Sequence, residues 1–246
     1  MNDLAAGSAR AVLNATTVAV DFTNNRVFGL TSGQIATGPV NESGTTFLTV
    51  EPPLPCFAKG TRIRTERGEI PIEAVHVGDR VAVLFGAPMQ QVVWIGHRRV
   101  DCRRHPARVR VWPVLVFAGA FGPGQPRRNL WLSPEHAVYI SDVLIPVRLL
   151  INHTSIVQVP MSTVTYYHVE LARHDVLLAE GLPVESYLDT GNRAAFGDAG
   201  GLITLHPDFA LRQWEAEGCA PLVFTGPTLA AARRRVNTIA NGAACA

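Results

Sequence analysis

The stretch "CFAKGTRIRTERGEIPIEAVHVGDRV", residues 56–81, decides the fold of this chain. It opens on a lone cysteine, Cys56, and then alternates apolar and polar side chains around glycine turns such as those at Gly60 and Gly68. Alternation with a period of two, in short runs between turn residues, is typical of half-buried strands. The stretch therefore predicts short antiparallel strands that begin directly after a thiol.

The same pattern continues over the next hundred residues. Runs such as "QVVWIG", "NLWLSPEHAVYI" and "VTYYHVEL" follow one another at close spacing, and no helical period is sustained before residue 205. Residues 206–218 and 226–242 then each place a proline near the start and a glycine at the end of a helical pattern. We expect an all-β fold of short antiparallel strands with two small C-terminal helices.

The amino-terminal part of the chain has a different composition. Its β-branched pieces "TTVAVDF" and "TTFLTVE", residues 16–22 and 45–51, lie between Gly, Asn and Ser clusters and predict two or three weak strands. The segment "EPPLP" at residues 51–55 forms a stiff linker, because each proline fixes φ and restricts its predecessor. We expect a short extension over residues 1–55, a β domain over 56–193 and a helical extension over 194–246.

Composition and charge exclude several classes of protein. With 246 residues, 47% of them hydrophobic, the chain can bury one substantial core. The formal charge of +2, from 22 Lys+Arg against 20 Asp+Glu, gives no global field for nucleic acid or an anionic membrane. The basic run at residues 97–110 lacks interleaved aromatics and favours a solvated loop or hairpin. We expect no nucleic-acid partner.

Targeting signals are weak in this sequence. The first 20 residues make a poor secretory signal, and no apolar run reaches the roughly 20 residues of a membrane span. The four cysteines are far apart and form no CxxC pair, which argues against a zinc ribbon and a thioredoxin-type motif. We expect a soluble protein with no transmembrane segment, and the sequence leaves its localisation open.

The stretch at Cys56 resembles the amino-terminal motif of Hint domains, the self-processing module shared by inteins and the carboxy-terminal half of Hedgehog proteins. The matching residues, at the spacing of that motif, are Cys56, Phe57, Gly60, Thr61, Ile63, Thr65, Gly68, Ile72, Glu73, Val77, Gly78, Asp79 and Val81. Farther along, "LSPEHAVYI" resembles the second Hint motif, with Ser133 and His136 in the place of its Thr-x-x-His. The resemblance implies a Hint fold over residues 56–193.

A third segment, "YYHVELARHDVLLAEGLPVESY" at residues 166–187, is similar to the carboxy-terminal intein motif. His174 falls on the histidine of that motif, and His168 falls where inteins often have Asp. Glu185-Ser186 stands in the place of the terminal His-Asn pair, with Tyr187 where a downstream Cys, Ser or Thr would follow. Without the asparagine, cyclisation at the second junction has no nucleophile. The resemblance is to a bacterial Hint subgroup and implies no full protein splicing.

The chemistry that the resemblance implies is an N-to-S acyl shift at the Pro55–Cys56 bond. It requires a thiol of adjustable pKa, an imidazole near the scissile nitrogen, and a hydroxyl or amide donor for the developing oxyanion. Cys56, His136 and Ser133 supply these three groups, and His174 is expected to act as a further acid–base group. Supporting roles are expected for three more residues: Thr61, Asp79 and His168.

The expected partners follow from this chemistry. Residues 1–55 are the candidate cleaved segment, water or a small nucleophile is the acceptor, and no metal or organic cofactor is required. Two alternatives stay open at this point. One is a catalytically silent Hint scaffold, and the other is a Cys-His hydrolase that acts on other proteins in trans.

Overall fold

The computed structural model of the chain describes residues 55–190, 193, 196 and 213–243, together with the backbone of four strands near the amino terminus. These strands are β1 (Ser8–Leu13), β2 (Thr16–Asp21), β3 (Arg26–Gly29) and β4 (Ile35–Thr37). They pair antiparallel in chain order. The predicted strand at residues 16–22 corresponds to β2, and the predicted strand at 45–51 lies outside the described residues.

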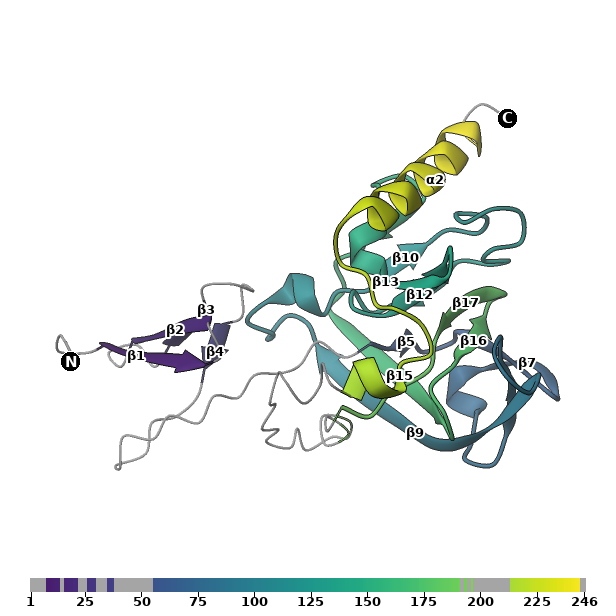
Figure 1. Cartoon of the computed structure of the whole chain (residues 1–246), viewed down its shortest axis with the longest axis horizontal. Coiled ribbons are helices and arrows are strands. Elements are labelled where there is room, and N and C mark those ends of the chain that lie inside the picture. Colours follow the sequence, from purple (N-terminus) through teal and green to yellow (C-terminus); the bar gives the residue numbers. More distant parts are fainter. Residues whose placement is uncertain are drawn as a thin grey trace.

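Within residues 57–185, 13 strands form a second sheet, all paired antiparallel, and Figure 1 shows its longest strands, β9 and β15, beside each other. The strands are β5 (Phe57–Ala58), β6 (Arg62–Thr65), β7 (Gly68–Pro71), β8 (Arg80–Ala82), β9 (Met89–Asp101), β10 (Val114–Val116), β11 (Leu130–Leu132), β12 (Ala137–Ile140), β13 (Val143–Pro146), β14 (Ile156–Gln158), β15 (Thr163–Leu171), β16 (Val176–Ala179) and β17 (Leu182–Glu185). Three 3-10 turns connect them: η1 (Ile72–Ala74), η2 (Arg108–Arg110) and η3 (Val147–Leu150). The predicted all-β fold is confirmed.

Strand β5 holds the start of this domain in the middle of the sheet. Its first residue, Phe57, is fully buried and pairs with Leu132 of β11 on one side and Tyr167 of β15 on the other. Strand β15 in turn pairs along most of its length with β9, the two longest strands of the sheet. Because Cys56 precedes Phe57, the strand pairing places the thiol between β11 and β15.

The β16–β17 hairpin brings the third sequence motif to the same region. Its two-residue turn, Glu180-Gly181, has φ values of 50° and 82°, the left-handed geometry of a type I′ turn. Strand β17 then pairs with β12 through Val184 and Val138. The next residue along β17, Glu185, therefore lies beside the start of β12.

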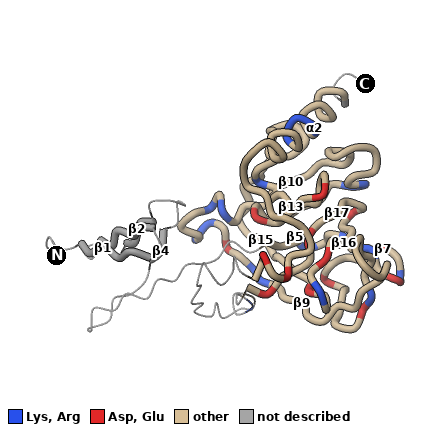
Figure 2. The backbone as a smooth tube through the Cα atoms, in the orientation of Figure 1, with Lys and Arg blue, Asp and Glu red and all other residues tan. Residues whose placement is uncertain are grey.

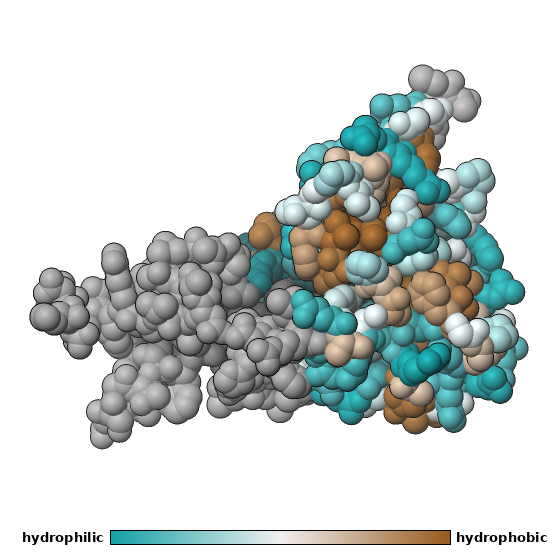
Figure 3. All heavy atoms as spheres, viewed as in Figure 1, coloured by the Kyte–Doolittle hydropathy of each residue, from teal (hydrophilic) through white to brown (hydrophobic). Residues whose placement is uncertain are grey.

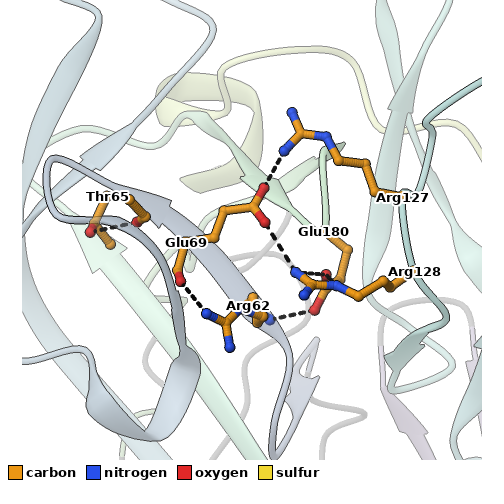
Figure 4. Close-up of polar contacts among 7 residues, drawn as sticks. Arg62, Thr65, Glu69, Arg127, Arg128 and Glu180 are labelled. Carbon is orange, nitrogen blue, oxygen red and sulfur yellow. Dashed lines mark hydrogen bonds and ion pairs between the residues drawn. The ribbon is translucent and has the colours of Figure 1, made fainter.

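An ion-pair network fixes this hairpin to the rest of the domain (Figure 4). Glu180 accepts hydrogen bonds from the backbone N–H of Arg62 at 2.8 Å and from the guanidinium of Arg128 at 2.8 Å. Arg128 also pairs with Glu69 of β7 at 3.0 Å, and Glu69 pairs with Arg127 as well. The turn of the β16–β17 hairpin is thus tied to the β6–β7 hairpin and to the segment before β11.

The C-terminal helix α2 (Pro227–Ala243) packs on the β domain. Leu229, Ala232 and Val236, three and four residues apart, belong to the same buried cluster as the strands. The helix predicted at residues 226–242 is confirmed, with Pro227 at its first position. Of the helix predicted at 206–218, residues 213–217 are helical and residues 206–212 lie outside the described part.

The surface of the described part is mixed. In Figure 2 the positions of Lys and Arg and those of Asp and Glu are interspersed along the backbone, and on the face shown in Figure 3 hydrophobic residues form separate groups among hydrophilic ones. Among the described residues, no helix is both long and apolar enough to cross a membrane.

Candidate active site

Two hydrogen bonds join the backbone of Cys56 to Ser133. The Cys56 N–H donates to Ser133 Oγ at 2.7 Å, and the Ser133 N–H donates to the Cys56 carbonyl at 2.8 Å. This pairing extends the β5–β11 register by one residue. The N–H in question belongs to the Pro55–Cys56 peptide bond, so the hydroxyl contacts the nitrogen of that bond. The hydroxyl proton remains available to donate, so the expected role of Ser133 toward the developing oxyanion stays a prediction.

His136 follows Ser133 in a tight turn, in which the His136 N–H donates to the Ser133 carbonyl at 3.1 Å. Its Nε2 lies 3.2 Å from the carbonyl oxygen of Glu185. A carbonyl only accepts, so Nε2 carries the ring proton and Nδ1 of the neutral ring has a lone pair. Nδ1 is buried and makes no hydrogen bond with the described residues.

The charge state of His136 is set by its burial. Loss of hydration lowers the pKa of this imidazole to about 4, and the nearby backbone of Cys56 and Glu185 opposes the change only in part. The ring is therefore neutral at pH 7. A neutral imidazole whose lone pair is not engaged in a hydrogen bond is suited to accept and return a proton.

The thiol of Cys56 is 2% exposed. Burial raises the pKa of this thiol far above its ordinary value, the charge of Glu185 raises it further, and Arg98 opposes the rise. The resting group is therefore the thiol and not the thiolate. A nucleophilic attack by Cys56 requires a neighbouring base.

His168 lies on the other side of Cys56. Tyr167 pairs with Phe57, so His168 is at the next position of β15, level with Cys56. Its ring is fully buried, with its centroid 5.1 Å from that of His136 and 5.2 Å from that of Tyr187. Burial, and then the neighbouring His136 and His174, lower the pKa of His168 well below its ordinary value. The structure brings this predicted supporting residue together with His136.

His174 makes its hydrogen bonds elsewhere. Its Nε2 lies 3.1 Å from the Ser186 carbonyl, and its Nδ1 accepts the Cys219 N–H at 3.0 Å. Trp214 packs edge-on against the ring at 5.0 Å. Both ring nitrogens are thus engaged, and burial lowers the pKa of His174 to about 4. The hydrogen bonds of His174 connect β17 to the C-terminal segment, not to Cys56.

Thr61 and Asp79 support the strands that follow Cys56. The Thr61 carbonyl accepts the Ile72 N–H at 2.7 Å, which closes the β6–β7 hairpin at its base. The Asp79 carboxylate accepts the His76 N–H at 2.9 Å and pairs with Arg67 at 2.7 Å. These bonds stabilise turns, and neither residue bonds to Cys56, Ser133 or His136.

Glu185 is the residue that sequence reasoning missed. It is 3% exposed, and its Oε1 accepts the Ala137 N–H at 2.6 Å while its carbonyl binds His136. Burial raises the pKa of the Glu185 carboxyl to about 8; the Ala137 N–H lowers it, and Glu135 raises it further. The signal was present in the sequence, because an acid ends the apolar strand "LPVE" at the place of a motif histidine.

The cysteines of the described part form no disulfide bond and no metal site. Cys56, Cys102 and Cys219 are free thiols, and no group of three or more His, Cys, Asp or Glu within the described ranges is arranged to hold a metal ion. The remaining cysteine, Cys245, lies outside these ranges.

Fold and site together define an all-β domain that encloses a buried cysteine at its first strand. A family model described as Hint domain matches residues 55–191, which is more than half of the chain. The chain belongs to the Hint domain family, as the three motifs predicted.

The solved structures that match this chain include two bacterial proteins. One is a bacterial intein-like domain from Clostridium thermocellum, with 14% identity, 54% of this chain and 98% of that chain covered, and a TM-score of 0.40. The other is a DnaB intein from Synechocystis sp. PCC 6803, with 8% identity, 55% and 100% covered, and a TM-score of 0.38. No curated protein matches the chain.

Proposed function

We propose that this Hint domain performs an N-to-S acyl shift at Cys56 and then cleaves its own chain at the Pro55–Cys56 bond, without splicing. Membership of the family supports self-processing in general. The observation that carries the specific proposal is the 2.7 Å hydrogen bond from the N–H of this bond to Ser133 Oγ, with His136 one turn away.

The first step exchanges an amide for a thioester. The Cys56 sulfur adds to the Pro55 carbonyl, the C–N bond breaks, and the thiol proton ends on the leaving nitrogen. No net proton is taken up, so a neutral shuttle is sufficient. His136 Nδ1 can take the proton from sulfur and return it to nitrogen, which avoids a lasting charge in a site where burial penalises ions.

Ser133 assists on the nitrogen side. As the C–N bond breaks, the nitrogen becomes an amine and gains positive character while it is protonated. The Ser133 Oγ, already 2.7 Å from that nitrogen, accepts a stronger hydrogen bond from it at this stage. The contact therefore favours the transition state over the resting amide.

The second junction has no equivalent chemistry. Ser186 occupies the place of the asparagine, and it carries no side-chain amide that could cyclise. Tyr187, at the place of the downstream nucleophile, is 1% exposed and its N–H donates to the Val169 carbonyl at 2.7 Å. Cleavage at one junction is the outcome that these side chains favour.

A hydrolase that acts in trans is the less favoured alternative. The Cys56 thiol is buried to 2% exposure, so a peptide from another molecule has no access to it in this conformation. The Pro55–Cys56 bond is already next to the thiol, because it directly precedes the thiol in the same chain.

The rate of cleavage at several protein concentrations tests this proposal. Self-processing is first order, so the fraction cleaved per hour should not change over a hundredfold dilution. Cys56→Ala should abolish cleavage, and Cys219→Ala, which removes a thiol that is free and partly exposed, should leave it unchanged. A rate that falls on dilution would indicate action in trans, and cleavage by Cys56→Ala would exclude the mechanism.

A further inference from the structure

Three acidic side chains of the described part are buried, and Glu185 differs from the other two. Glu180 is neutralised by Arg128 and also binds the Arg62 N–H. Asp175 accepts three hydrogen bonds, from the Phe85 and Val176 N–H groups and from Gln90. The Glu185 carboxyl has one donor, the Ala137 N–H at Oε1, and no cation pairs with it among the described residues.

The position of Glu185 connects it to the reaction site. Its carbonyl oxygen is the acceptor for His136 Nε2, and its carboxyl accepts the N–H of the next residue, Ala137, so Glu185 holds the imidazole and the backbone that follows it. His136 in turn bonds through its N–H to the carbonyl of Ser133, whose Oγ accepts the Cys56 N–H, so a chain of hydrogen bonds connects Glu185 to the residue that carries the thiol. A carboxyl with one uncommitted oxygen near a reactive bond is suited to general-base work.

We propose that Glu185 is the base that activates the water molecule that hydrolyses the Pro55–Cys56 thioester. This inference rests on the proposed function and assigns a residue to its second step. It also gives a physical reason why the thioester ends in cleavage, since the domain supplies its own means of using water as the acceptor.

Hydrolysis of the thioester takes place in two stages. The water oxygen bonds to the Pro55 carbonyl carbon while the Glu185 carboxylate takes one water proton. The tetrahedral intermediate then expels the Cys56 sulfur, the C–S bond breaks, and Glu185 returns the proton to the sulfur. The products are a carboxyl group on Pro55 and the Cys56 thiol, and Glu185 is regenerated.

Several titratable groups surround Glu185 and bear on its ionisation. They come from each element packed around it: Cys56 before β5, Glu135 and His136 between β11 and β12, His174 and Asp175 before β16, and Cys219 in the C-terminal segment. The histidines and thiols are neutral at pH 7, and the charge of Glu135 disfavours ionisation of Glu185. The pKa of Glu185, raised to about 8, therefore predicts that hydrolysis increases through this pH.

The test separates thioester formation from thioester hydrolysis. Glu185→Gln keeps an oxygen to accept the Ala137 N–H, so it removes the base with little change in shape. Release of the segment before Cys56 is measured in plain buffer from pH 6 to 10, and separately with hydroxylamine, which cleaves the thioester without a protein base. Glu66→Gln, at an exposed position, is the matched control.

We expect wild type and Glu66→Gln to show hydrolysis that rises through about pH 8 and then levels off. In Glu185→Gln, hydrolysis of the thioester at pH 9 should be slower by about tenfold or more, and its rate should be proportional to the hydroxide concentration. The rate of hydroxylamine cleavage in this variant should equal that of the wild type. An unchanged buffer profile, or loss of hydroxylamine cleavage in this variant alone, would overturn the role of Glu185. Absence of hydroxylamine cleavage in every protein, wild type included, would instead overturn the proposed function.

Discussion

At the scale of single residues, the site consists of groups that burial holds in their neutral forms. The Cys56 thiol and the three buried histidines all have pKa values moved in the direction that disfavours charge. Hydrogen bonds then fix which nitrogen of each histidine carries its proton. Neutral groups of this kind are suited to the proton transfers that the proposed reaction requires.

In the proposed reaction, Ser133 contacts the nitrogen of the bond that breaks. Ser133→Ala leaves the Cys56 N–H without its acceptor in a buried position and removes the contact with the leaving nitrogen. We expect thioester formation, measured as the rate of hydroxylamine cleavage, to fall by about tenfold to a hundredfold. Ser133→Thr keeps the hydroxyl and should restore the rate to near wild type. A Ser133→Ala variant that reacts as fast as wild type would exclude the role of this contact.

His174 is expected to make the unfolding free energy of the chain depend on pH. Its pKa is about 4 in the folded chain and 6.5 in the reference state, so the unfolded chain binds a proton more readily. The stabilisation is complete above pH 6.5 and is lost as the pH falls toward 4, by up to roughly 3 kcal/mol. His174→Gln should reduce the fall in unfolding free energy between pH 7 and pH 4.5, measured by urea denaturation. His76→Gln, at an exposed position, is the matched control, and an equal effect of both substitutions would contradict the account.

At the scale of elements, two strand pairings assemble the site from distant parts of the sequence. The pairing of β5 with β11 brings Ser133 to Cys56, and the pairing of β12 with β17 brings Glu185 to His136. Each pairing joins only one pair of residues, Phe57 with Leu132 and Val138 with Val184, and the neighbouring turns fix its register. The β16–β17 turn is therefore part of the support of the site.

Substitution of Gly181 tests whether the β16–β17 turn stabilises the fold. Its φ of 82° is one that L side chains rarely adopt, and an added Cβ would lie 3.1 Å from the Arg127 side chain and 3.3 Å from the Gly124 carbonyl. We expect Gly181→Ala to lower the unfolding free energy by about 1–3 kcal/mol. In the β12–β13 hairpin, Ser141 holds a similar φ of 52° without being glycine, and Ser141→Asn should stabilise by a few tenths of a kcal/mol at most. Equal effects of the two substitutions in urea denaturation would contradict this reading of the turns.

These pairings also explain what could be predicted from the sequence. The alternation after Cys56 and the three motifs predicted the all-β fold and the residue types of the site. They could not predict that Ser133 contacts the nitrogen side of the bond, because the β5–β11 register decides that contact. The sequence placed Glu185 at the position of a motif histidine, but it could not predict the hydrogen bond with His136, because 49 residues separate the two.

At the scale of the whole molecule, the β domain and helix α2 share one core. Pro227 and the glycine near its end predicted the helix, but the arginine-rich "AAARRRVNTIA" is too weakly amphipathic to predict its packing. In the structure, Val236 is fully buried among the side chains of the main cluster, and Arg233 Nε donates to the Leu149 carbonyl at 2.6 Å. The predicted boundary at residue 193 stays a prediction about chain organisation, whereas the core extends across it.

Truncation of Val236 measures how much α2 contributes. Val236→Ala removes two methyl groups from a fully buried site and should lower the unfolding free energy by about 1–3 kcal/mol in a single transition. The exposed neighbour Arg235→Ala should change it by less than about 0.5 kcal/mol. A separate early transition in Val236→Ala would show that the helix unfolds independently of the β domain.

The measurement that tests the central claim most directly is the intact mass of the purified chain, with and without hydroxylamine, beside Cys56→Ala. The account predicts that hydroxylamine accelerates the appearance of a fragment that begins at Cys56, with a hydroxamate on the segment that ends at Pro55, and that Cys56→Ala stays whole. A wild-type chain that remains uncut under all these conditions would contradict the acyl shift. The domain would then be a catalytically silent member of the Hint family.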